Sequence, residues 1–135
     1  MKTKKLIING IIVGFVFLIL DMLFAMITSP FFSPYSDLAI WKIPPNLAAG
    51  GVFDFINGFI LVGVFMMIYN GIPGTGWRKG LNYGIIVGLF RVVMMSFSVI
   101  VMYAVPIELV VISLISGFIE IIVLCILLSM IYEKI

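Results

Sequence analysis

Four charged side chains interrupt the long apolar runs of this sequence: Asp21, Asp54, Arg91 and Glu120. If those runs cross a membrane, each charge costs about 2.5–3.5 kcal/mol on insertion scales and should face protein or water rather than lipid. We therefore expect these residues, together with Asn57, to form an intramembrane polar cluster. Arg91 and Glu120 fall near the middle of their runs, so an ion pair between them is plausible.

Two interpretations of this polar cluster remain open. In the first, the charges lock the packing of the helices and have no activity of their own. In the second, three acids and one base line a pathway or pocket for a proton, a cation or a small polar solute. A carboxylate that stabilises helix packing and one that carries protons look the same in a sequence. The positions of these acids therefore do not decide between the two interpretations.

Residue types needed for most catalysis and metal binding are missing. The chain has no histidine and one cysteine, Cys125, which lies within an apolar run. Ser–His and Cys–His nucleophiles, internal disulfides and the commonest metal ligands are therefore excluded. An aspartyl pair of Asp21 and Asp54 would need both acids close together, and no flanking motif supports it. We predict that the protein is not an enzyme and uses no cofactor or metal.

The glycine-rich stretch 71–76 resembles a phosphate-binding loop only superficially. Such a loop needs Lys and then Ser or Thr directly after its last glycine, whereas Trp77 and Arg78 follow here. The chain also lacks a long basic run with interleaved aromatic residues. We therefore expect no nucleotide and no nucleic acid among its partners.

Composition places the chain in a lipid bilayer. Of its 135 residues, 64% are hydrophobic and 10% are charged, whereas soluble domains are roughly half apolar and a quarter charged. Four apolar segments, about 6–28, 52–70, 81–105 and 108–132, are each near the roughly 20 residues that cross a bilayer core. They lack the alternation typical of strands. We predict an all-α integral membrane protein in which residues 1–135 form a single four-helix transmembrane bundle.

Basic residues predict its orientation. A bundle with an even number of spans places both termini and the second connection on one side, and that side carries Lys2, Lys4, Lys5, Arg78, Lys79 and Lys134. On the other side, Lys42 is the only basic residue of the predicted loops. Because cytoplasmic segments are enriched in Lys and Arg, we expect a multi-pass protein of the cell membrane with cytoplasmic N- and C-termini.

The connection between the first two spans, residues 29–46, contains four prolines. Proline interrupts helices, so we predict a loop here. Its aromatic residues, including Phe31 and Trp41, suit the headgroup region, which favours a loop on the membrane surface. A lid over a cavity or a docking surface for a partner is the alternative.

An internal repeat is visible along the chain. Residues 9–15 match residues 83–89, and residues 56–60 match residues 115–119 in the same order. The pattern predicts two tandem parallel two-helix repeats, with halves at about 6–70 and 81–132.

Small and polar residues follow one face of each predicted helix. In the third helix this stripe contains Gly84, Gly88, Arg91, Met95 and Ser98. Glycines on such stripes let backbones approach closely. The expected helix-packing glycines are Gly10, Gly14, Gly58, Gly84, Gly88 and Gly117. Packing within the bundle is the main expectation, and homodimerisation through these faces is the alternative.

The expected function is that of a non-catalytic subunit or oligomer-forming module of a membrane assembly. Its partners would be lipid and either further copies of the chain or other membrane subunits. In this interpretation the polar cluster specifies helix packing. The alternative is a minimal transporter or channel for protons, cations or a small polar solute.

Overall fold

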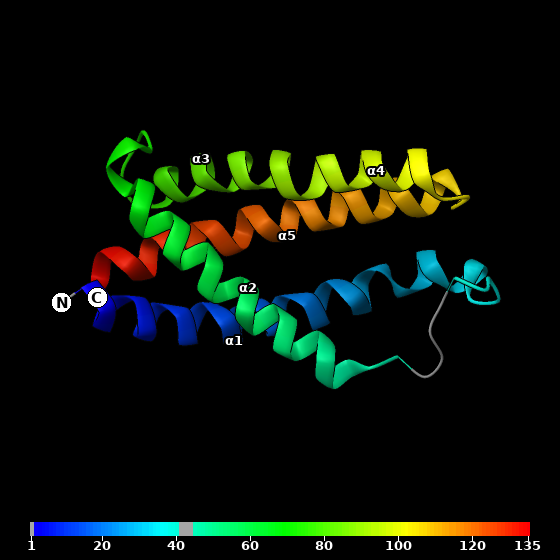
Figure 1. Ribbon diagram of the computed structural model, residues 1–135, viewed down its shortest axis with the longest axis horizontal. Helices are drawn as coiled ribbons and strands as arrows, with labels where there is room; N and C mark the ends of the chain where they lie inside the picture. The colour runs from blue at the N-terminus through cyan, green and yellow to red at the C-terminus, as the bar shows by residue number, and fades with distance from the viewer. Residues whose placement is uncertain (1, 41–44) are drawn as a thin grey trace.

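Helices account for most of the chain. The computed structural model describes residues 2–40 and 45–135. Its α-helices are α1 (Lys2–Phe32), α2 (Leu47–Ile68), α3 (Trp77–Gly88), α4 (Met94–Met102) and α5 (Ile107–Lys134) (Figure 1). A π-helical turn, Leu89–Val93, makes α3 and α4 one continuous span. Within the described residues, four helical segments are long and apolar enough to cross a membrane: Thr3–Tyr35, Leu47–Gly71, Trp77–Met102 and Ile107–Lys134. The predicted all-helical chain with four apolar spans is confirmed at this level.

The first span is longer than the sequence indicated. We predicted that its helix ends near residue 28, but α1 continues through Pro30 to Phe32, followed by a 3-10 turn at Ser33–Tyr35. Proline removes one backbone donor, and in the last turn of a helix that loss affects a single hydrogen bond. The loop after this turn is correspondingly shorter. Trp41 and Lys42, which belong to the predicted loop, lie outside the described residues.

The bundle consists of two helical hairpins. α1 packs along α2, α3 and α4 pack along α5, and the hairpins meet mainly where α1 lies against α5. Figure 1 shows the two chain ends at the same end of the bundle, and Lys5 Nζ lies 5.1 Å from the centre of the Tyr132 ring. The organisation of the chain as two tandem repeats stays a prediction.

Packing is tight at one end of the bundle and loose at the other. The fully buried apolar side chains lie mostly in the second half of α2, in α3 and in the second half of α5, and they include Leu61, Val62, Phe65, Tyr83, Leu124 and Leu128. Along one face of α1, Val13 and Phe17 are buried, but Asp21 is exposed and Thr28 is half-buried. We call the end that holds both termini the closed end and the opposite end the open end.

Hydrogen bonds fasten the connection between α2 and α3 at the closed end. Glu133 Oε1 accepts from the Gly76 N–H at 2.9 Å and from the Tyr69 hydroxyl at 3.1 Å. The Ser129 hydroxyl donates to the Gly76 carbonyl at 2.9 Å. Lys79, expected in a loop, lies in the first turn of α3, where its Nζ donates to the Tyr69 carbonyl at 2.9 Å. These bonds tie α2, α3 and α5 together.

Glycine allows the helices of the first hairpin to approach closely. A Cβ atom on Gly58 of α2 would lie 2.7 Å from the backbone of Gly14 on α1. Gly10 faces the ring of Phe59, which a Cβ atom would approach to 2.5 Å. Side chains at Gly10 and Gly58 would therefore force α1 and α2 apart or displace the ring.

The second hairpin uses glycine in the same way at three of its positions. A Cβ atom on Gly80 would lie 2.5 Å from the Cys125 carbonyl oxygen. On Gly84 it would lie 2.9 Å from the Ile122 Cα, and on Gly88 it would lie 2.7 Å from the Phe118 ring. Gly117 differs, because its nearest neighbour is a Val92 side-chain carbon at 3.5 Å, an ordinary contact. Gly117 instead faces a cavity.

Candidate functional site

Arg91 lies in the π-helical turn Leu89–Val93 of the third span. Single π turns inside α-helices occur frequently at functional sites. The guanidinium carbon lies 5.2 Å from the centre of the Phe17 ring on α1, in a cation–π contact. Arg91 therefore reaches across from the second hairpin to the first.

Acidic side chains from the other three spans lie near this guanidinium. Glu120 of α5 is only 8% exposed, and its Oε1 is buried with no hydrogen-bond partner among the described residues. Asp54 of α2 is half-buried, as is Asn57 one turn farther along, and Asp21 of α1 is exposed. The charges of Asp21, Asp54, Arg91 and Glu120 lie close enough to act on one another. Each span thus contributes one ionisable group to what we call the polar centre.

The structure does not form the direct ion pair that the sequence made plausible. In the part of the chain that is described, no carboxylate oxygen lies within 4.0 Å of the Arg91 guanidinium. The guanidinium packs over Phe17 instead. If all four groups are ionised, three carboxylates and one guanidinium leave a net charge of two negative units. The polar centre is therefore a set of separated charges.

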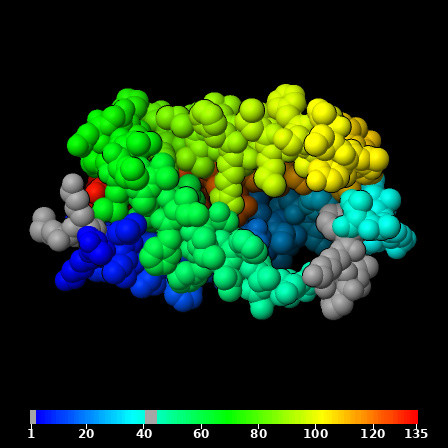
Figure 2. Space-filling model, in the orientation of Figure 1, coloured from blue at the N-terminus to red at the C-terminus, as the bar shows by residue number. Residues whose placement is uncertain are grey.

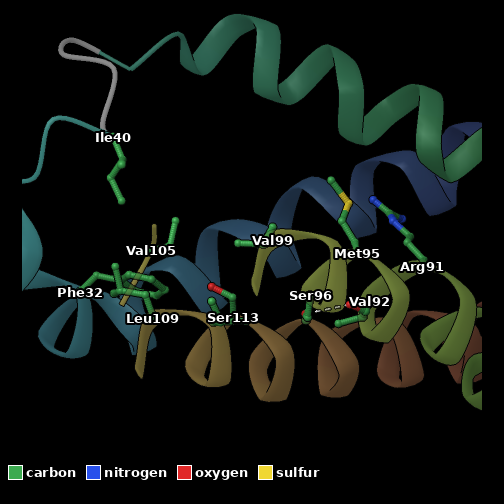
Figure 3. Close-up of a pocket in the computed structure, with 12 residues that line it drawn as sticks. Phe32, Ile40, Arg91, Val92, Met95, Ser96, Val99, Val105, Leu109 and Ser113 are labelled. Atoms are coloured by element: carbon green, nitrogen blue, oxygen red, sulfur yellow. Dashed lines mark hydrogen bonds between the residues drawn. The ribbon is translucent and has the colours of Figure 1, made fainter. Parts of the chain in front are cut away.

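A cavity of about 330 Å³ opens beside Arg91. Its twelve lining residues are mostly apolar: Phe32, Ile40, Arg91, Val92, Met95, Ser96, Val99, Val105, Leu109, Val110, Ser113 and Gly117. Figure 3 shows Arg91 and Met95 at one end of this lining and Phe32, Val105 and Leu109 at the other. In the space-filling view the surface is hollowed between α4 and the first half of α2, with part of α1 visible at the bottom (Figure 2).

One member of the polar centre, Arg91, lines this cavity, whereas Asp21, Asp54 and Glu120 are not among its lining residues. Arg91 belongs to the lining, and so does Gly117 of α5. Glu120 follows Gly117 by three residues, so it lies on the same face of α5, one turn closer to the closed end. Beyond it, buried apolar side chains such as Ile121 and Leu124 fill the bundle. The cavity therefore has mostly apolar walls, and among the described residues Arg91 is the one charged residue of its lining.

This arrangement suits the binding of a proton, a cation or a polar group of a solute. Over residues 2–40 and 45–135, no group of three His, Cys, Asp or Glu side chains is placed to hold a metal ion. The three acids come from different helices, and none of them is among the residues that line the cavity.

The sequence pattern missed part of the cavity wall. We predicted that the stripe of the third span continues from Arg91 to Met95 and Ser98, but the cavity is also lined by Val92, Ser96 and Val99, and Ser98 is not part of it. The π-helical turn explains this, because it holds one residue more than an α turn and shifts the face that follows it. The Ser96 hydroxyl donates to the Val92 carbonyl at 2.8 Å and is buried.

The connection between the first two spans also lines the cavity. The sequence predicted a surface loop there, with a lid over a cavity or a docking surface as the alternative. Phe32 at the end of α1 and Ile40 in the loop line the outer part.

Comparison of the chain with models of protein families, with curated proteins and with solved structures finds no match. Its function must therefore be inferred from the polar centre and the cavity.

Proposed function

We propose that this chain is a small transporter or channel of the cell membrane, not an enzyme, whose polar centre handles protons, cations or a small polar solute. The observation that carries this proposal is the cavity lined by Arg91, with acids of the other three spans close enough to act on that charge and on one another. Ionisable residues inside membrane spans mark ion and proton pathways when they face a cavity. Charges that served packing alone would be expected to form direct, hydrogen-bonded pairs, and Glu120 Oε1 has no such partner among the described residues.

The distribution of basic residues supports a direction for this cavity. Lys4, Lys5, Arg78 and Lys134 lie at the closed end. The positive-inside rule would place that end, with both termini, in the cytoplasm. The cavity would then open toward the outside and be separated from the cytoplasm by the buried apolar layer of Leu61, Phe65 and Leu124.

Proton uptake into proteoliposomes that contain a trapped pH-sensitive dye tests this proposal. Under an imposed inside-negative potential, we expect the wild-type chain to admit protons faster than protein-free liposomes. Glu120→Gln should reduce that rate at least tenfold, because it removes the buried titratable group and keeps its shape. The control is Glu108→Gln, which changes an exposed acid in the first turn of the same helix and should leave the rate unchanged.

Folding of both variants is checked by gel filtration and circular dichroism in detergent. Wild-type uptake no faster than that of protein-free liposomes would contradict the handling of protons. So would a folded Glu120→Gln variant that keeps the full rate.

A second candidate function is a non-catalytic subunit or oligomer-forming module, and the exposure of Asp21 favours it. This carboxylate lies on the open half of α1, where Met22, Leu23 and Met26 are also exposed. A helix of a second copy or of another membrane subunit would remove the charge from lipid. Native mass spectrometry in mild detergent tests this: we expect a complex that Asp21→Asn dissociates, and a purely monomeric wild-type chain without co-purifying subunits would contradict it.

A further inference from the structure

We propose that the cavity beside Arg91 binds a carboxylate with an apolar body, its head at the Arg91 guanidinium and its body along the walls formed by α4 and α5. This inference rests on the proposed transport function, since it names the polar group of a transported solute. Three properties of the cavity carry it: the sign of the charge in its lining, the unused donors of that charged group and the apolar walls.

The lining contains one charged residue among those described, and this residue is a cation. Arg91 alone carries a charge there, and no Asp or Glu is among the lining residues. Asp54 and Glu120 lie close enough to feel the charge of Arg91, but neither belongs to the lining. A ligand in the cavity therefore meets a guanidinium at one end and no carboxylate in the walls.

The guanidinium of Arg91 has unused hydrogen-bond donors. Arginine carries five N–H donors in a planar fork that matches the two oxygens of a carboxylate. Over residues 2–40 and 45–135, none of these donors is given to an oxygen, because the guanidinium packs over the Phe17 ring instead. Arg91 is half-buried, and its nitrogens are not among the buried atoms that lack a partner. An oxygen of a ligand can therefore reach them.

The acids of the polar centre weaken this site without occupying it. No carboxylate oxygen of the described chain lies within 4.0 Å of the guanidinium, whereas charge-assisted hydrogen bonds join N and O atoms at about 2.7–2.9 Å. Because the Coulomb energy falls with distance, a bound carboxylate would attract Arg91 at contact and be repelled by Asp54 and Glu120 from farther away. Removal of one acid should therefore tighten the binding of an anion and weaken that of a cation.

The walls and the volume of the cavity suit an apolar body of modest size. Sites for small molecules commonly measure about 300–1,000 Å³, and this cavity measures about 330 Å³. Val99 and Val110 supply aliphatic surface from α4 and α5. Figure 3 shows Arg91 at one end of the lining and Phe32 and Leu109 at the other. A carboxylate bound to Arg91 would extend its body along these walls, which a bare small anion would leave uncovered.

The test titrates the full chain in nanodiscs of phosphatidylcholine by calorimetry, with empty nanodiscs as the baseline. Benzoate, benzamide and benzylammonium share an aromatic body and differ in the charge of the head, whereas acetate keeps the head and lacks the body. We expect saturable binding of benzoate, at least tenfold weaker binding of benzamide and of acetate, and no saturable binding of benzylammonium.

Charge variants test which groups act on the ligand. Arg91→Gln should weaken benzoate binding at least tenfold, and Glu120→Gln should strengthen it. The matched control is Arg78→Gln. The Arg78 guanidinium also packs on an aromatic ring, that of Trp77 at 5.6 Å, but it is exposed at the closed end, so its loss should not change benzoate binding.

A further variant keeps the proposal testable if Arg91→Gln fails to fold. Ser113 lies exposed on the cavity wall, so Ser113→Phe should fill the cavity, leave Arg91 in place and abolish benzoate binding. The proposal is overturned if benzylammonium binds saturably and benzoate does not, or if no probe binds the wild type saturably. It is also overturned if a folded Arg91→Gln variant binds benzoate as tightly as the wild type.

A fatty acid of the membrane carries the same head group as a dissolved carboxylate, and native mass spectrometry of the chain purified from cells distinguishes these sources. The mass of a fatty acid retained by the wild type and lost in Arg91→Gln would support the site with a ligand from the membrane. A bare wild-type chain that binds benzoate would support the site with a dissolved ligand.

The outcomes separate this inference from the transport function. Proton uptake in proteoliposomes without benzoate binding would reject the ligand class and leave transport standing. Benzoate binding without uptake of protons or of benzoate would support the site and reject transport.

Discussion

Single residues decide how closely the two helices of each hairpin approach. Gly58 and Gly14 meet backbone to backbone, so no atom of a flexible side chain can move away if a methyl group is added. Gly50 lies in the same helix, α2, and has nothing within 4 Å of its Cβ position. Gly58 is therefore required for close packing of the helices, whereas a methyl group at Gly50 would meet no neighbouring atom.

Gly58→Ala should therefore destabilise the bundle, whereas Gly50→Ala should leave its stability unchanged or slightly raised. Overpacking of a tight contact typically costs about 1–3 kcal/mol. Unfolding of both variants with sodium dodecyl sulfate, followed by circular dichroism, measures the difference. Equal midpoints for Gly58→Ala and the wild type would show that α1 and α2 do not approach as closely as described.

Tyr83 connects the hairpins through one buried hydrogen bond. Its hydroxyl donates to the Leu61 carbonyl at 2.8 Å, and its ring packs 5.1 Å from that of Phe65. Tyr83→Phe keeps the ring and removes the donor, so it should lower stability by about 0.5–1.5 kcal/mol. Tyr103→Phe, at a position that is 67% exposed, is the matched control and should have no effect in the same denaturation measurement.

At the scale of elements, the π-helical turn Leu89–Val93 sets which residues of the third span face the cavity. Before the turn, Gly80, Gly84 and Gly88 pack against α5. After it, the facing positions are shifted by one residue. A π turn has no distinctive composition, so the sequence could not reveal this shift.

Other elements were predictable in part. The four spans followed from the length and apolarity of their segments, and the charges and glycines stood out because both are unusual in apolar helices. The role of Glu133 was not predictable, because it depends on a turn 57 residues away in the chain. The cavity was not predictable either, because it depends on how the two hairpins separate toward the open end.

Deletion of one residue tests the role of the π turn. Deleting Phe90, a residue that is 77% exposed within the turn, should convert it to a regular α turn and keep α3 and α4 on their present faces. Deleting Phe97 from the regular helix α4 should instead rotate all later residues of the span by about 100°. We expect the first variant to keep a thermal midpoint in detergent close to that of the wild type and the second to lose several degrees.

The opposite ranking of these two deletion variants would contradict the assignment of the π turn. Similar losses in both would show that the faces of α3 and α4 are not coupled through it.

At the scale of the whole molecule, the bundle is closed at the end that holds the termini and open at the other. Buried apolar side chains and the hydrogen bonds of Glu133, Ser129 and Lys79 hold the closed end. The open end contains the cavity, which reaches Arg91 of the polar centre. This asymmetry is the basis of the proposed transport function, because Arg91 has a cavity on one side and a packed apolar layer on the other.

Accessibility of the cavity to water from outside the cell tests this account most directly. In a Cys125→Ala background, Ser113→Cys places a thiol on the cavity wall, and Val111→Cys places one at similar depth on the opposite side of α5, where Val111 is 46% exposed. A membrane-impermeant maleimide added to intact cells should label Ser113→Cys and leave Val111→Cys unlabelled, because only a thiol in contact with water forms the reactive thiolate. Failure to label Ser113→Cys, or equal labelling of both positions, would contradict a water-filled cavity that leads to the polar centre.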